Sequence, residues 1–211
     1  MEASQESIQF QSGDLQLEGV LHRPPGNGPF PGVVVCHPHP LYGGDMSNNV
    51  VLAVCGAMTG ASIIAMRFNF RGVGESAGSF SDGTGEQQDA MAALTFLSSL
   101  DYVDSARIGL AGYSFGATVS LPVSLRDDNV EALALVSPPL PSPEWEKIQS
   151  YSKLCLILGG TEDEFFVPPE SLPSQCQCEL IAGADHFWWG HEGTLGNKVS
   201  AFFSTVFGLP G

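Results

Sequence analysis

A serine between two glycines, at the end of an apolar run, constrains the fold of this 211-residue chain more than any other feature. The segment Arg107-Ile-Gly-Leu-Ala-Gly-Tyr-Ser-Phe-Gly-Ala-Thr118 places the pattern G-x-S-x-G between an apolar run and small, helix-compatible residues. In a strand-turn-helix this tight, a Cβ atom at Gly112 or Gly116 would collide with neighbouring backbone. The pattern therefore predicts a nucleophile turn that holds Ser114 at the end of a strand, with its hydroxyl exposed.

The same pattern occurs a second time, at Gly74-Glu-Ser-Ala-Gly78. A loop-like sequence, 79–85, follows this second match in place of a helix. We interpret it as a glycine-rich turn, because a nucleophile turn needs a strand before it and a helix after it. Ser76 is therefore predicted to be a loop residue.

A serine is a weak nucleophile until a base takes its proton, and the base needs a carboxylate to orient it. The buried-strand pattern 153–158 leads to Asp163, and a second strand pattern, 176–181, leads to His186. The order serine, acid, histidine, each after a predicted strand, is that of the α/β-hydrolase fold. Ser114, Asp163 and His186 are therefore the predicted catalytic residues.

Three other carboxylates compete for the role of the acid. Glu162 and Glu164 flank Asp163, and Asp185 adjoins His186. Asp185 would have to fold back on its own neighbour to orient the ring, which favours Asp163. The two glutamates remain open alternatives.

Two longer motifs, together with this ordered triad, resemble a known family. They are His37-Pro-His-Pro-Leu-Tyr-Gly-Gly44 and Arg67-Phe-Asn-Phe-Arg-Gly-Val-Gly74. From about Gly19 to Phe207 the chain resembles small α/β-hydrolases of the dienelactone-hydrolase-like type, and more narrowly the lidless bacterial esterase-like proteins. The resemblance implies an esterase-like serine hydrolase. A dienelactone hydrolase proper would carry a cysteine nucleophile, whereas this chain has a serine.

The turn at 37–40 occupies the place where α/β-hydrolases supply part of their oxyanion hole. Its two prolines lack amide hydrogens, so the donor is the backbone N–H of His39 or of Leu41, paired with that of Phe115. We favour His39. The two histidine side chains shape the turn by hydrogen bonds or bind a metal; no acidic or cysteine partner lies at a recognisable spacing, so we predict no metal.

Aromatic residues beside these turns are candidates for the substrate pocket. Tyr42, Phe187 and Trp188 are predicted to line the acyl pocket, and ordinary packing at the edge of the core is the alternative. Only 137–151 separates two predicted strands, an interval too short for a lid. We therefore expect an open active site that favours small or medium acyl groups over long lipid chains.

Strands alternate with helices along the chain, which predicts a mostly parallel sheet with helices on both faces and the active site at the carboxyl ends of the strands. The first strands, within 7–23, are expected to be two antiparallel edge strands. Helices are expected at 48–59 with Ser47 as its cap, at 85–100 with a capping box beginning at Thr84, and from about Leu195 onward. Pro122 is expected to kink or end the helix after the serine.

Composition limits the partners of the chain. Eight Lys and Arg against 23 Asp and Glu give a formal charge of −15, which opposes binding to nucleic acid, anionic membranes and strongly anionic substrates. The amino terminus lacks the pattern of a secretory signal, and no apolar run approaches the length of a membrane span, so we expect a cytoplasmic protein. The length and the 43% hydrophobic content predict a single domain over 1–211, as a monomer or homodimer.

These observations predict a carboxylesterase-type serine hydrolase that acts on a small-molecule ester and needs no cofactor. A thioesterase, lactonase or peptidase using the same triad remains an alternative, because acyl transfer from oxygen, sulfur or nitrogen uses the same machinery. A non-catalytic binding protein on a hydrolase scaffold is a further alternative. Such reuse usually damages at least one triad member, whereas all three are chemically intact here.

Overall fold

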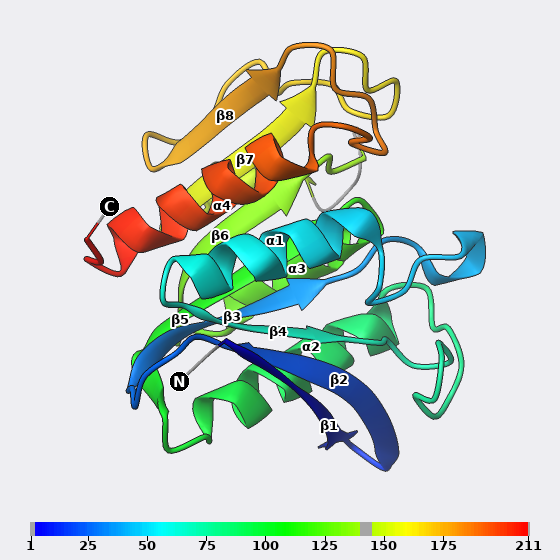
Figure 1. Cartoon of the computed structure of the whole chain (residues 1–211). Coiled ribbons are helices and arrows are strands. Elements are labelled where there is room, and N and C mark those ends of the chain that lie inside the picture. Colours follow the sequence, from blue (N-terminus) through cyan, green and yellow to red (C-terminus); the bar gives the residue numbers. More distant parts are fainter. Residues whose placement is uncertain (1–2, 140–144, 211) are drawn as a thin grey trace.

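Eight strands form one sheet in the computed structural model, which describes residues 3–139 and 145–210 (Figure 1). The strands are β1 (Ser4–Ser12), β2 (Leu15–Arg23), β3 (Phe30–Cys36), β4 (Ile64–Phe68), β5 (Val103–Tyr113), β6 (Val130–Val136), β7 (Leu154–Gly160) and β8 (Cys176–Ile181). Their order across the sheet is β1-β2-β4-β3-β5-β6-β7-β8. Neighbours from β4 to β8 run parallel, which confirms the prediction of a mostly parallel sheet.

The amino-terminal hairpin extends the sheet on one side. β1 pairs antiparallel with β2 through a turn at Gly13, whose φ of 59° suits glycine. β2 also pairs antiparallel with β4, with Gly19 opposite Phe68. Of these two strands, β1 lies at an edge of the sheet and β2 does not. The prediction of two edge strands is therefore wrong for β2, because this strand satisfies the hydrogen-bonding groups that β4 would otherwise expose.

Helices cover both faces of the sheet, as predicted (Figure 1). One face packs against α2 (Thr84–Ser98), α3 (Phe115–Arg126) and the short 3-10 helix η2 (Trp145–Ser150), and the other against α1 (Asn49–Gly60) and α4 (Glu192–Val206). The central strands are buried on both sides, which is why their apolar runs are continuous.

Two helices begin with different caps from those predicted. Asn48, rather than Ser47, caps α1 with its side-chain oxygen. Gly83, rather than Thr84, is the N-cap of α2, and the carboxylate of Glu86 accepts the N–H of this glycine at 2.8 Å. Adjacent residues with similar capping propensity compete at such positions, and the path of the preceding turn decides between them.

Pro122 lies inside α3, which continues to Arg126. Of the two effects expected of this proline, an end of the helix is therefore wrong, and a kink remains a prediction. Proline removes one helical hydrogen bond, but α3 packs between the sheet and its neighbours, with Val119, Leu121 and Val123 buried. Burial of this apolar face offsets the loss, since tertiary packing supplies most of the stability of a protein helix.

The carboxyl ends of the parallel strands share one edge of the sheet. The turns that follow β3, β5, β7 and β8 carry His39, Ser114, Asp163 and His186. Between β6 and β7 the described residues form η2, and residues 140–144 of this interval lie outside the described part of the chain. No helix within the described ranges combines the length and the apolar character that crossing a bilayer requires.

Candidate active site

Ser114 occupies the turn between β5 and α3, with a φ of 54° and a ψ of −117°. A positive φ is strained for a residue that has a Cβ atom, so the surrounding backbone must hold it in place. A Cβ at Gly112 would lie 2.3 Å from the carbonyl oxygen of Gly116, and one at Gly116 would lie 2.3 Å from that of Cys36. The two glycines therefore have the steric role that the sequence predicts.

Ser114, His186 and Asp163 form a continuous chain of hydrogen bonds. Nε2 of His186 lies 3.0 Å from Oγ of Ser114, and Nδ1 lies 2.9 and 3.0 Å from the two carboxylate oxygens of Asp163. An ionised carboxylate only accepts hydrogen bonds, so Nδ1 carries the proton of the neutral ring. Nε2 is then free to accept the proton of the serine hydroxyl. The fold thus brings together the three residues that the sequence singled out.

The carboxylate of Asp163 is buried, yet its pKa lies below the ordinary value. Burial acts in the opposite direction, because it disfavours the charged form. Hydrogen bonds from His186, Ser137 and the backbone N–H of Phe165 outweigh it. Asp163 is therefore ionised at neutral pH, as a group that orients the imidazole must be.

Ser137 connects this carboxylate to the core. It follows β6 with a φ of 45°, is fully buried, and accepts a hydrogen bond from the indole N–H of Trp188 at 2.9 Å. Trp188 has no exposed surface, so the prediction that it lines the substrate pocket is wrong. The sequence contains no signal for Ser137, because a serine after a strand is common and its partner lies 51 residues away.

The competing carboxylates have other surroundings. Asp185 accepts two backbone N–H groups in the turn that follows it. Glu162 and Glu164 are exposed on either side of the buried Asp163. Within the described residues, Asp163 is the carboxylate that bonds the ring of His186.

Two backbone N–H groups near Ser114 are available to a negatively charged oxygen. Nδ1 of His39 accepts the N–H of Leu41 at 3.2 Å, so that donor is already engaged. In the described part of the chain, the N–H groups of His39 and Phe115 have no acceptor. Phe115 begins α3, where helical N–H groups are free. This geometry favours the pair His39 and Phe115, whose rings pack with centroids 4.7 Å apart.

His37 shapes the turn before these donors. Its ring is fully buried, with Nδ1 2.6 Å from the carbonyl oxygen of Pro38 and Nε2 3.1 Å from the N–H of Phe70. Burial lowers its pKa to about 4, so the ring is neutral at pH 7 and both nitrogens are engaged. Among the residues that the structure describes, no group of three or more His, Cys, Asp and Glu side chains could hold a metal ion.

The motif 67–74 holds the far end of the loop that follows β3 and carries His39. Arg67 donates to the carbonyl oxygen of Met46 at 3.1 Å and to Nε2 of His22 at 2.8 Å. The side-chain oxygen of Asn69 accepts the N–H of Met46 at 2.8 Å. Residues at the end of β4 therefore fix the loop that carries His39.

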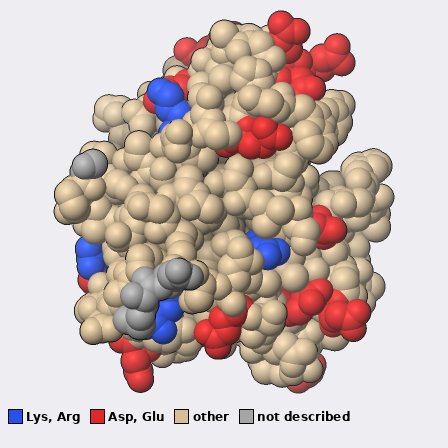
Figure 2. All heavy atoms as spheres, viewed as in Figure 1, with Lys and Arg blue, Asp and Glu red and all other residues tan. Residues whose placement is uncertain are grey.

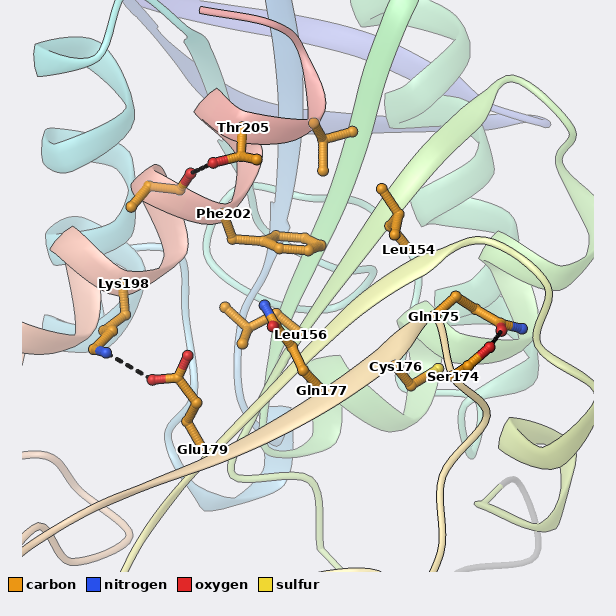
Figure 3. A pocket seen from close by; sticks show the side chains of 12 residues that line it. Leu154, Leu156, Ser174, Gln175, Cys176, Gln177, Glu179, Lys198, Phe202 and Thr205 are labelled. Atoms are coloured by element: carbon orange, nitrogen blue, oxygen red, sulfur yellow. Dashed lines mark hydrogen bonds and ion pairs between the residues drawn. The ribbon is translucent and has the colours of Figure 1, made fainter. Parts of the chain in front are cut away.

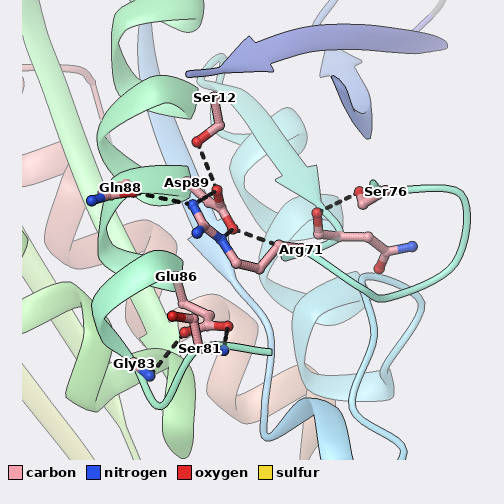
Figure 4. Close-up of polar contacts among 9 residues, drawn as sticks. Ser12, Arg71, Ser76, Ser81, Gly83, Glu86, Gln88 and Asp89 are labelled. Carbon is pink, nitrogen blue, oxygen red and sulfur yellow. Dashed lines mark hydrogen bonds and ion pairs between the residues drawn. The ribbon is translucent and has the colours of Figure 1, made fainter. Parts of the chain in front are cut away.

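Arg71 anchors the loop that follows β4 to α2 (Figure 4). Its guanidinium forms two hydrogen bonds with the buried carboxylate of Asp89, at 3.0 and 2.8 Å, and Ser12 donates a further one at 2.7 Å. A buried carboxylate with this set of donors is fully satisfied. The glycine-rich loop is thus held by a structural ion pair.

The second G-x-S-x-G match lies in this loop. Ser76 is buried and donates to the carbonyl oxygen of Asn69 at 2.7 Å (Figure 4). It also accepts the N–H of Glu18 at 3.1 Å. The prediction that it is a loop residue is confirmed.

Aromatic side chains flank the reactive groups on two sides. Tyr42, which is 88% exposed, packs on the ring of His39 with centroids 4.7 Å apart. Phe165 and Phe187 contact the ring of His186 edge-on, at 4.9 and 5.8 Å, and both are more than half exposed. Tyr42 and Phe187 therefore remain candidates for contact with substrate. The sequence patterns did not indicate Phe165 as a pocket residue, because it lies in a loop without periodicity.

A separate cavity of about 480 Å³ opens between β7, β8 and α4 (Figure 3). Leu154, Leu156 and Phe202 contribute apolar surface, and Lys198 forms an ion pair with Glu179 beside them at 2.7 Å. Leu154 begins β7, whereas the reactive groups lie beyond the opposite end of that strand. This cavity is therefore separate from the candidate active site.

Comparisons with known proteins point to one family. Residues 17–179 match the sequence model of the dienelactone hydrolase family. An α/β serine hydrolase homologue from Coxiella burnetii is 34% identical, with a TM-score of 0.83 over 93% of this chain and 96% of that one. A lidless α/β serine hydrolase from Xanthomonas campestris is 29% identical, also with a TM-score of 0.83, over 100% of this chain and 97% of that one. The predicted α/β-hydrolase fold is confirmed, and the described residues between β6 and β7 form no lid.

Among curated sequences, an uncharacterised protein of Rickettsia prowazekii (strain Madrid E) is 37% identical over 63% of this chain and 55% of its own length. The chain spans about half the length of the curated relatives it matches.

Proposed function

This chain belongs to the dienelactone hydrolase family, and on that basis we propose that it is a carboxylesterase-type serine hydrolase that cleaves small to medium acyl esters. The observation that carries the proposal is the hydrogen-bonded chain from Ser114 through His186 to Asp163. A serine that only caps a helix would need neither a base nor an ionised acid behind it.

In the proposed reaction, Oγ of Ser114 attacks the carbonyl carbon of the ester while its proton moves to Nε2 of His186. Asp163 holds the ring in the tautomer that can accept this proton, and stabilises the imidazolium that forms. The carbonyl oxygen becomes an oxyanion, which the N–H groups of His39 and Phe115 would stabilise.

Collapse of this intermediate breaks the bond to the leaving oxygen, which takes the proton from Nε2 and departs as an alcohol. A water molecule then gives a proton to Nε2 and attacks the acyl-enzyme. The second intermediate releases the carboxylic acid and returns the proton to Ser114. Every step uses side chains and backbone groups of this chain, so we propose that it needs no cofactor.

We further propose small-molecule substrates and no nucleic acid or membrane partner. Acidic side chains lie spread around the face in Figure 2, and the charge of −15 repels polyanions and anionic lipid surfaces. A cytoplasmic location and a monomeric or homodimeric state remain predictions, testable by fractionation and by light scattering.

Fluorophosphonate labelling tests the proposal directly, because the probe modifies an activated serine. We expect the wild-type protein to label and Ser114→Ala to remain unlabelled while folded. On p-nitrophenyl esters, kcat/KM should be highest for short or medium acyl chains. A folded wild-type protein that does not label would refute the proposal, and a preference for long chains with interfacial activation would refute the acyl-size assignment.

Thioesters, lactones and aminoacyl anilides would pass through the same intermediates. Turnover on one member of each class, compared with a matched ester at equal enzyme concentration, decides among them. Highest kcat/KM on the ester is the expected outcome.

A further inference from the structure

Proton transfer defines where the leaving group of a substrate must lie. In the proposed reaction the leaving oxygen takes its proton from Nε2 of His186, so it has to approach within hydrogen-bond distance of that atom. Substituents on this oxygen then extend past the edge of the imidazole. The ring centroids of Phe165 and Phe187 lie 4.9 and 5.8 Å from that of His186.

Both phenylalanines are held by their backbones while their rings face solvent. The N–H of Phe165 bonds the carboxylate of Asp163 at 2.9 Å, and the N–H of Phe187 bonds that of Asp185 at 2.9 Å. Asn49 also donates to the carbonyl oxygen of Phe187 at 2.9 Å. The two residues are nevertheless 56% and 55% exposed. Their backbone positions are therefore set in advance, and their side chains are available to a ligand.

We propose that Phe165 and Phe187 form a leaving-group subsite that selects esters of arylmethyl and aryl alcohols. The inference rests on the proposed function, and it assigns Phe187 to the alcohol side of the ester where the sequence suggested the acyl side. Aromatic rings attract one another when their centroids are 4.5–7 Å apart, so a ring one or two bonds beyond the leaving oxygen would gain from pairing with either phenylalanine.

The charges around the subsite narrow the class further. Exposed Glu164 precedes Phe165, and Asp185 lies two residues before Phe187. Their carboxylates disfavour a leaving group that carries a negative charge. The subsite therefore fits an uncharged or cationic aromatic alcohol.

Benzyl acetate and cyclohexylmethyl acetate test the subsite. Both esters give acetate and a primary alcohol of similar size on hydrolysis, and they differ in the π system of the ring. We expect wild-type kcat/KM to favour the benzyl ester, and Phe165→Leu and Phe187→Leu each to reduce this preference on the order of 2- to 10-fold, the range typical of one aromatic contact.

Tyr42→Leu is the matched control, because Tyr42 is an exposed ring that packs on His39. It should leave the benzyl-to-cyclohexylmethyl ratio unchanged, whatever its effect on absolute rates. Thermal melting verifies that each variant is folded, and ethyl acetate measures turnover without a ring.

A wild-type ratio near one overturns the subsite, as does a preference that survives both phenylalanine variants. If ethyl acetate turnover and fluorophosphonate labelling persist in that case, the proposed hydrolase function stands. If the folded wild type neither labels nor turns over any of these esters, the hydrolase function itself is refuted, and the subsite with it.

Discussion

Asp163 differs from its two glutamate neighbours in burial and in hydrogen bonds. We predict that Asp163→Asn lowers kcat on p-nitrophenyl acetate by about 10⁴, the magnitude found for the equivalent change in a serine protease. An asparagine amide can donate to Nδ1 and so favour the tautomer that cannot accept the serine proton. Glu162→Gln and Glu164→Gln, both at exposed positions, should change kcat by less than about twofold. If Glu162→Gln or Glu164→Gln loses its activity while Asp163→Asn keeps it, the catalytic acid is misassigned.

Ser76 is expected to affect stability and to leave catalysis largely unchanged. Its hydroxyl links the carbonyl oxygen of Asn69 to the N–H of Glu18 in a buried position, so Ser76→Ala leaves both groups without this partner. We predict a loss of roughly 1–3 kcal/mol in the free energy of unfolding, measured with urea. Fluorophosphonate labelling of the folded variant should persist. Loss of labelling at retained stability would mean that Ser76, and not only Ser114, takes part in the reaction.

At the scale of elements, the junction of β5 with α3 depends on close approach of backbone to backbone. We predict that Gly116→Ala destabilises the protein by several kcal/mol and abolishes labelling, because its Cβ would lie 2.3 Å from the carbonyl oxygen of Cys36. Circular dichroism melting and labelling of the same samples measure both effects.

Gly56→Ala in α1 is the matched control. Apart from its chain neighbours and the adjacent backbone of α1, no heavy atom lies within 4 Å of its added Cβ, so alanine should stabilise the helix by up to about 1 kcal/mol. Equal effects of the two substitutions would contradict the steric account of the nucleophile turn.

For the whole molecule, pH-dependent stability follows from its buried histidines. Burial lowers the pKa of His37, and of His22, from 6.5 to about 4. Between these values the unfolded chain binds more protons than the folded one, so the free energy of unfolding should fall as pH decreases from 6.5 to about 4. For the fully buried His37, this pKa shift corresponds to roughly 3 kcal/mol in the free energy of unfolding.

Urea denaturation of wild type and His37→Gln between pH 4 and 7 measures this contribution. Glutamine keeps an acceptor for the N–H of Phe70 but does not titrate in this range, so the variant should lose less stability on acidification even if it is weaker at pH 7. The same pH slope in both proteins would show that His37 is not protonated on unfolding.

The local parts of this molecule could be predicted from the sequence. The glycines around Ser114 act on atoms a few residues away, and apolar periodicity reports the burial of each strand and helix, so the nucleophile turn and the order of elements follow from neighbouring residues. The order of serine, acid and histidine then predicted which three side chains would meet. The sequence left Glu162 and Glu164 as alternatives for the catalytic acid, because a shift of one residue in a turn reverses which side chain faces inward. The burial of Asp163 decides among the three.

The tertiary structure decided everything that depends on distances between remote segments. Trp188 belongs to the core because its indole reaches Ser137, 51 residues earlier, and Phe165 borders the reactive groups because the turn after β7 meets the one after β8. His39 is favoured over Leu41 because its own ring, packed against Phe115, accepts the competing N–H. These contacts depend on how strands and turns pack against one another, and no local pattern in the sequence records that packing.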